Sequence, residues 1–184
     1  MSVALRSAMG FLRRILGKDT TTDVLELLAS QHKEVDQLIE QLEHGSGPKR
    51  ALLTRLADKL GAHATVEEQL FYPAVMTRDT EDMLHEAVEE HLAIKRLLVD
   101  MLEMRFDDDG FEVKLIVLKE QVTHHAHEEE EGELFPKVKS LLSVDERAGL
   151  GNEVLVMFEE LMRGHPSQNV PRETDAAAEL PSPR

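Results

Sequence analysis

Four segments of the sequence repeat apolar residues at helical spacing, and each carries one histidine on its apolar face. In the first segment, His32 stands four residues after Leu28 and three before Val35. The corresponding histidines of the other three segments are His63, His91 and His125. Apolar residues repeated every three or four positions predict an amphipathic helix whose apolar face is buried. The sequence therefore predicts helices that share one core and point four imidazoles into it.

The four segments span about residues 23–44, 48–76, 80–105 and 111–142, and a fifth helical segment ends near residue 162. Short turn-forming stretches such as GSGPK and DDDG separate them. Long helices joined by short connections pack as antiparallel neighbours. We therefore predict an all-α fold, an up-down four-helix bundle with an extra C-terminal helix, over residues 20–163. The tail 164–184 is rich in proline and small polar residues, and we expect it to be largely disordered.

Residues 1–19 form a separate N-terminal segment. Its first 18 residues carry four basic residues and no acidic one, with apolar residues at helical spacing. This pattern predicts a short amphipathic helix that contacts a partner or a membrane surface. The chain has neither a secretory signal pattern nor an apolar run long enough to span a membrane. We expect a cytoplasmic protein.

The charge and the cysteine content restrict the ligands. The net charge of −15 repels phosphate backbones, so we expect no nucleic acid partner and regard cations as the natural ligands. The chain contains no cysteine. A bound metal must therefore be held by histidines and carboxylates, which suit iron, manganese or zinc.

The buried histidines indicate a metal because unsatisfied buried polar groups cost roughly 1–3 kcal/mol each. Glu67 follows His63 by four residues, so both side chains reach one centre from the same helix face. The stretch HATVEEQLFYP is similar to HAHEEEEGELFP, which is one residue longer. Counting four from His125 selects Glu129, whereas counting back from the proline selects Glu130, and a π-bulge would reconcile the two counts. Glu129 is slightly preferred because it continues the apolar face.

The stretches QHKEVDQLI, HATVEEQLFYP, EEHLAIKRLL and HHAHEEEEGELFP, in this order, resemble the hemerythrin-like, HHE cation-binding family. The resemblance covers about residues 24–142. It implies a non-heme di-iron centre, with two iron ions bridged by carboxylates and an oxo or hydroxo group. Carried over to this chain, the terminal ligands are His32, His63, His91 and His125, and the bridges are Glu67 and either Glu129 or Glu130.

The third helix departs from the oxygen-carrying hemerythrins, whose third helix supplies a His-xxx-His pair. Ala87 stands four residues before His91, and His85 stands six before it. The chain therefore resembles the bacterial hemerythrin-like proteins, and an iron needs water, Glu90 or Tyr72 to complete its shell. The resemblance implies an iron protein that binds or senses O2, NO or peroxide, with slow peroxide or redox turnover, rather than reversible oxygen storage.

Three alternatives remain at this point. The first is iron oxidation or storage, although the Glu-x-x-His spacing of the ferritin-like proteins is absent. The second is iron delivery for the repair of iron–sulfur proteins. The third is a scaffold bundle without metal, whose histidines are hydrogen-bonded core residues. Metal analysis of the purified protein separates the third from the others.

Overall fold

The computed structural model describes residues 22–45 and 47–184, so the predicted amphipathic segment 1–19 lies outside the described residues. Within them, all regular structure is helical, which confirms the predicted all-α class. The α-helices are α2 (Val24–Glu43), α3 (Lys49–Val66), α4 (Tyr72–Val75), α5 (Glu81–Glu103), α6 (Phe111–Thr123), α7 (Phe135–Leu141) and α8 (Val144–Arg163). No helix of this part of the chain is both long and apolar enough to cross a membrane.

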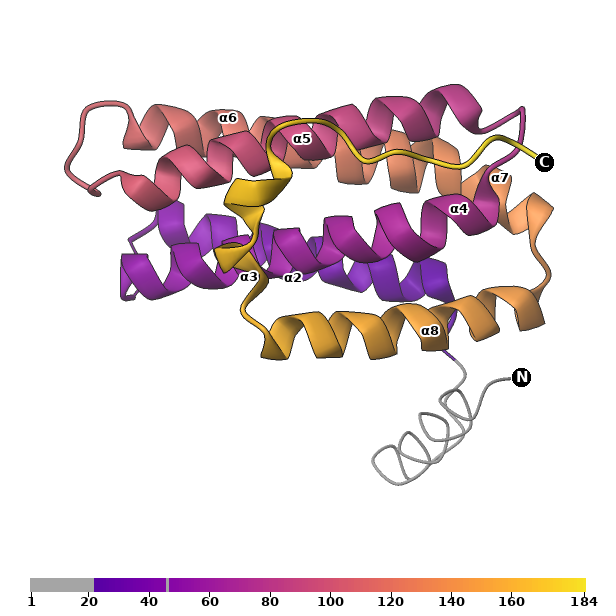
Figure 1. Cartoon of the computed structure of the whole chain (residues 1–184). Helices are drawn as coiled ribbons and strands as arrows, with labels where there is room; N and C mark the ends of the chain where they lie inside the picture. The colour runs from indigo at the N-terminus through magenta and orange to yellow at the C-terminus, as the bar shows by residue number, and fades with distance from the viewer. Residues whose placement is uncertain (1–21, 46) are drawn as a thin grey trace, which may run out of the picture.

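Four helical rods, which the elements from α2 to α7 form, surround the core (Figure 1). The first rod is α2 and the third is α5. The second runs through α3, the π-helix η1 (Glu67–Phe71) and α4, and the fourth through α6, the π-helix η2 (His124–Leu134) and α7. Helix α2 packs against α3 and α6, and α5 packs against the same two helices. The rods therefore close a ring, and each has a neighbour on both sides.

Helix α8 lies outside the ring, along α2 and α3 (Figure 1). The approach to the start of α2 is so close that a Cβ atom on Gly151 would stand 2.0 Å from the carbonyl oxygen of Thr22. The Arg147 guanidinium donates to the Asp23 carboxylate at 2.7 Å, and Asp23 also caps α2. Only glycine fits at position 151, and this contact fixes α8 against the first rod.

The core consists of two apolar clusters with a layer of buried histidines and glutamates between them. Along α2, the chain passes from Leu28 in one cluster to His32 and then to Val35 in the other. On the fourth rod, Val122 belongs to the second cluster and the buried His125 follows it by one turn. The apolar faces read from the sequence are therefore buried as predicted, and the polar layer crosses the molecule between them.

Both π-helices interrupt helices that the sequence predicts to be continuous. Each lies just before a proline, Pro73 in α4 and Pro136 in α7. Proline has no backbone N–H and cannot donate to the carbonyl four residues earlier. Wider turns of this kind are frequent at functional sites. The segment η2 spans eleven residues, so the local change in register is longer than the single bulge considered from the sequence.

The C-terminal segment differs from the disordered tail that its composition predicts. Two short 3-10 helices, η3 (Pro166–Gln168) and η4 (Val170–Glu173), pack against α3 and α5 respectively. Val170 is buried against Gly61 of α3, where an added Cβ atom would meet it at 3.1 Å. The Ser167 backbone N–H donates to Asp58 at 2.9 Å. A few anchoring contacts order the segment, and average composition does not reveal them.

Candidate metal centre

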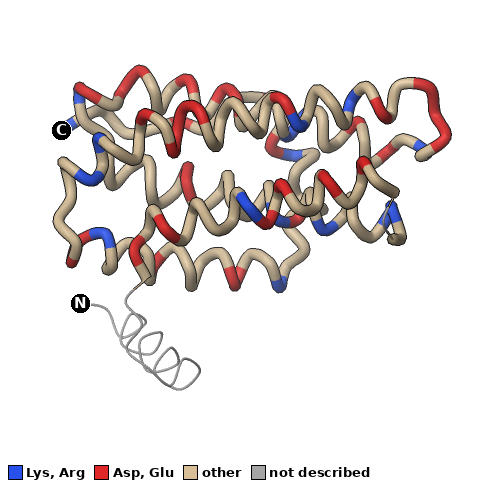
Figure 2. Tube along the Cα trace, turned by 180° about the vertical axis from the view of Figure 1, so that it is seen from behind, with Lys and Arg blue, Asp and Glu red and all other residues tan. Residues whose placement is uncertain are grey.

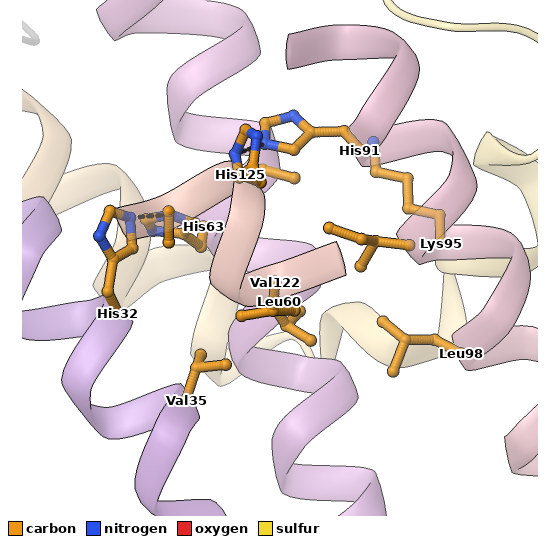
Figure 3. A pocket seen from close by; sticks show the side chains of 12 residues that line it. His32, Val35, Leu60, His63, His91, Lys95, Leu98, Val122 and His125 are labelled. Carbon is orange, nitrogen blue, oxygen red and sulfur yellow. Dashed lines mark hydrogen bonds between the residues drawn. The ribbon is translucent and has the colours of Figure 1, made fainter. Parts of the chain in front are cut away.

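The four predicted histidines meet in the polar layer as two pairs (Figure 3). In the α2–α3 pair, His32 Nε2 stands 3.1 Å from His63 Nε2. In the α5–η2 pair, His91 Nε2 stands 3.0 Å from His125 Nε2. All four side chains are buried. The structure therefore brings together one imidazole from each rod and turns every Nε2 atom toward the interior.

Glu67 lies between the two pairs. Its Oε1 atom is 3.2 Å from His63 Nε2, and its Oε2 atom is 3.3 Å from His91 Nε2. The side chain is completely buried at the first position of η1. One carboxylate thus reaches one histidine of each pair, as a bridging ligand must.

Glu130 is the second carboxylate of the layer. Its Oε2 atom is 3.2 Å from His32 Nε2 and 3.9 Å from His125 Nε2, and the residue is buried. The sequence-based preference for Glu129 is therefore wrong, because Glu130 is the residue that faces inward. Glu129 is partly exposed and pairs with His124 at 3.0 Å on the outside. The π-helix separates the inward histidine and glutamate by five residues instead of four.

Three carboxylate oxygens of the layer are buried without a hydrogen-bond donor: both oxygens of Glu67 and the Oε2 atom of Glu130. The nearest imidazole nitrogens are close, but their geometry does not make a hydrogen bond. Such orphaned oxygens are costly in an apolar interior. Oxygens and imidazole nitrogens that face one another in this way are the donor set that iron, manganese and zinc accept. The residues present therefore fit a bound cation.

Four acceptors behind the histidines hold their Nδ1 atoms. They are Gln31 for His63 at 2.8 Å, Glu68 for His91 at 3.0 Å, Glu90 for His125 at 2.8 Å and Glu131 for His32 at 2.8 Å. Each acceptor stands next in sequence to an inward residue of one rod and serves the histidine of the adjacent rod. A proton held on Nδ1 leaves the Nε2 lone pair free, which is the tautomer that binds a metal. Sequence reasoning missed Gln31, Glu68 and Glu131 in this role.

The two carboxyls of the layer differ in pKa. Burial and the nearby charge of Glu130 raise the pKa of Glu67 well above its usual value. Burial also raises the pKa of Glu130, but the close His32 imidazole and the other surrounding imidazoles outweigh it, so the net shift is downward. Burial and the neighbouring His32 lower the pKa of His63. Without a cation the layer thus favours one protonated and one ionised carboxyl, while two metal charges would allow both to ionise.

The other sequence candidates lie around this layer. The Tyr72 hydroxyl donates to Glu130 Oε1 at 2.9 Å, and its ring stacks on His91 with the centroids 5.7 Å apart. Glu90 accepts from the Nδ1 atom of His125, on the side away from the layer. His85 is exposed on α5. Tyr72 and Glu90 therefore support ligand candidates from behind, and His85 is not brought to the site.

The outer side of η2 is the solvated face that the acidic run predicts. Glu128 and Glu133 are exposed, and His124, with about half of its side chain exposed, pairs with Glu128 at 2.9 Å. The partly exposed His127 bonds Glu131 at 3.1 Å and Asp36 at 3.0 Å. Acidic residues also outnumber basic ones along α2, α5 and α8 (Figure 2). The field at the surface therefore attracts cations.

A cavity of about 20 Å³ adjoins the four histidines (Figure 3). Beyond the imidazoles, it is lined by Val35, Leu60, Ala64, Ile94, Lys95, Leu98, Val122 and Ala126. This volume is just large enough for about one water molecule. The space next to the imidazoles is therefore small and mostly apolar.

Three comparisons place the chain among known proteins. Residues 23–138 match the sequence profile of the hemerythrin HHE cation binding domain. The crystal structure of an HHE cation binding domain-containing protein from Mycobacterium kansasii superposes with a TM-score of 0.68 at 23% identity, covering 85% of this chain and 97% of that one. That similarity shows a hemerythrin-like helical fold.

A curated DNA nickase from Nostoc sp. (strain PCC 7120 / SAG 25.82 / UTEX 2576) is 25% identical over 126 residues. The match covers 67% of this chain but 36% of the nickase, so the chain spans about a third of that relative. The profile match covers more than half of the chain and contains all four paired histidines and both buried glutamates. The chain belongs to the hemerythrin HHE cation-binding domain family.

Proposed function

We propose that the polar layer binds two iron ions as a non-heme di-iron centre bridged by carboxylates and an oxo or hydroxo group. The terminal ligands are His32 and His63 on one ion and His91 and His125 on the other, with Glu67 and Glu130 as bridges. The observation that carries this proposal is the set of three orphaned carboxylate oxygens between two pairs of Nε2 atoms. Zinc and manganese suit the same ligands, so metal analysis of the native protein must identify the bound metal.

The unit that holds the centre is, in this proposal, an up-down four-helix bundle to which α8 is an addition. Each rod supplies one histidine, and the second and fourth rods each supply one glutamate as well. Cofactor sites in such bundles are built from side chains on facing helices. The Nδ1 acceptors keep each imidazole in the tautomer and orientation that a metal requires.

The centre binds or senses O2, NO or peroxide and turns over peroxide or other redox substrates slowly at most. Iron supplies the open coordination positions and the electrons that these molecules require. The chain contributes a small, mostly apolar cavity beside the imidazoles, which has no room for a large substrate. This lining suits an uncharged diatomic molecule better than an ionic one. The adjacent Tyr72 hydroxyl holds Glu130 in place from the other side.

The test is the native metal content combined with anaerobic mixing. The ferrous protein is mixed separately with O2, NO and peroxide while the charge-transfer absorption bands are followed. We expect about two irons per chain and a spectral change with at least one of the three molecules. Iron far below this content would contradict the di-iron centre, and the absence of any spectral response would contradict the proposed ligands.

Iron oxidation, storage or delivery is the second candidate, and one surface feature favours it. A pocket of about 250 Å³ lies between α5 and η2, lined by Met83, Glu86, Ala87, His124, Glu128, Glu129, Glu130, Glu133 and Leu134. It is predominantly acidic and reaches Glu130. Aerobic loading with ferrous iron tests the storage part of this candidate, since storage requires far more than about two irons per chain. Nickase activity is not carried over from the relative, because a net charge of −15 opposes binding to DNA.

A further inference from the structure

Lys95 is the only lysine or arginine that is buried within residues 22–45 and 47–184. Its Nζ atom donates to both oxygens of Glu68 at 3.0 Å and lies 3.2 Å from the carboxylate of Glu173 in the C-terminal segment. A buried ammonium is costly unless it is paired and hydrogen-bonded. The sequence places it one helical turn after His91 on α5, where it continues the buried face (Figure 3).

Lys95 shares its partner with the metal centre. Glu68 Oε1, which accepts from Lys95, also accepts from His91 Nδ1 at 3.0 Å. Glu68 is therefore held from two sides, and the Lys95 ammonium offsets part of the negative charge that His91 would otherwise face.

The other three Nδ1 acceptors show what this division of charge achieves. Glu131 accepts from His32 in the α2–α3 pair, and Glu90 accepts from His125 in the α5–η2 pair. The fourth acceptor, Gln31, is neutral and serves His63. Glu68 and Lys95 carry opposite charges and add no net charge as a pair, although the partly exposed Glu173 also contacts the Lys95 ammonium. Each histidine pair is therefore backed by one carboxylate and one neutral group, although the two neutral groups are built differently.

We propose that Lys95 is a positioning residue of the metal centre, which orients Glu68 toward His91 and matches the charge behind the α5–η2 pair to that behind the α2–α3 pair. The inference rests on the proposed di-iron function, since it concerns how evenly two ions are held. A carboxylate acceptor raises the basicity of a metal-bound imidazole and so stabilises the more oxidised metal. Lys95 limits this effect at His91.

Two substitutions are expected to act in opposite directions. Lys95→Met keeps most of the volume but gives His91 the full charge of Glu68, so the reduction potential of one iron shifts to more negative values. Glu173→Gln removes a competing carboxylate from Lys95, so that potential shifts to more positive values. The second shift is smaller because Glu173 is half-exposed and its charge is screened. Lys95→Arg retains the charge and is expected to restore most of the wild-type potential.

The matched control is Lys59→Met. Lys59 is also a largely covered lysine paired with a glutamate, Glu34, but that glutamate holds none of the four histidines. Its substitution is expected to alter stability without moving either potential. Iron content is measured first in every variant, so that loss of metal is not mistaken for a shift in potential.

The experiment has a metal-free and a metal-loaded part. In the iron-free protein, long-range ¹H–¹⁵N NMR spectra of the imidazoles report each Nδ1 proton. We expect Lys95→Met to move the His91 signal downfield and to leave His63 unchanged. In the loaded protein, a redox titration follows the two one-electron steps.

Distinct outcomes separate the two proposals. If wild-type protein binds no iron, the di-iron proposal fails, whereas the imidazole spectra still report whether Lys95 acts on His91. If wild-type protein binds iron but Lys95→Met changes only stability, with unchanged potentials and an unchanged His91 signal, Lys95 is merely structural and the inference is overturned. If Lys95→Met does not fold, Glu173→Gln and Lys95→Arg decide. The inference is overturned if Glu173→Gln leaves the potential unchanged or makes it more negative while Lys95→Arg stays near the wild-type value.

Discussion

The two halves of the candidate metal centre have the same inner surface but different supports. The α2–α3 half presents two Nε2 atoms 3.1 Å apart, and the α5–η2 half presents two at 3.0 Å. Behind them, the first half uses a carboxylate and the amide of Gln31, whereas the second uses two carboxylates, one of which is paired with Lys95. Inner residues are limited by what a metal accepts, while their supports need only supply an acceptor and a suitable total charge. The two halves of the centre can therefore be equivalent although different side chains support their histidines.

The largest expected effect comes from Glu130, because it serves both halves. Glu130→Gln removes an ionised bridge between His32 and His125, and we expect iron content to fall from about two per chain to well below one. Metal analysis after anaerobic loading measures this. Glu129→Gln is the matched control on the adjacent, partly exposed position and is expected to retain at least about 80% of the iron. If the two variants exchanged these outcomes, the assignment of the inward carboxylate would be wrong.

Removing one histidine from each half tests their equivalence. His63→Ala and His125→Ala each leave the other pair intact, and we expect both variants to hold about one iron per chain. Equal iron contents are expected because each half has one carboxylate and one neutral support. Titration with ferrous iron, followed by metal analysis, gives the two contents. A large difference between the variants would show that one half dominates binding, and the comparison of equal halves would fail.

The smallest effect concerns stability without metal. The folded-state pKa of Glu67 is raised, so the unfolded chain loses this proton at a lower pH than the folded chain. Wild-type stability attributable to this group therefore falls as pH rises above the ordinary value of 4.5. Glu67→Gln does not titrate, and we expect the metal-free variant to be more stable than wild type by about 1–3 kcal/mol at neutral pH. Urea unfolding at pH 7 and near pH 4.5 checks this, because the difference must shrink at the lower pH.

The inward histidines were predictable because helical periodicity fixes which face of each rod is buried. His32 lies on the same apolar stripe as Leu28 and Val35, and Glu67 follows His63 by one turn, so their convergence needed only the packing of four rods. Glu130 was not fixed in this way. A π-helix changes the angle between successive residues, and no local pattern in the acidic run states where the wider turns begin.

The Nδ1 supports were harder to predict because they depend on which rods are neighbours. Glu68 and Glu131 look like parts of solvated acidic runs in the sequence. Their position next to Glu67 and Glu130 was the available signal, since a residue adjacent to an inward ligand turns toward the neighbouring helix. Lys95 also left a signal, because it continues the buried face of α5 one turn after His91.

The polar layer between the two apolar clusters interrupts the apolar packing of the four rods. This layer contributes little apolar surface to the contacts between the rods. Its side chains are polar or charged, and their burial is costly without a partner. A metal ion bound in this layer would link all four rods, whereas the two apolar clusters already hold the ends of the rods together. Without a metal ion, the middle of the four rods would therefore be less stable than their ends. Hydrogen exchange of the backbone amides near the polar layer would detect loss of the ion before any global unfolding did.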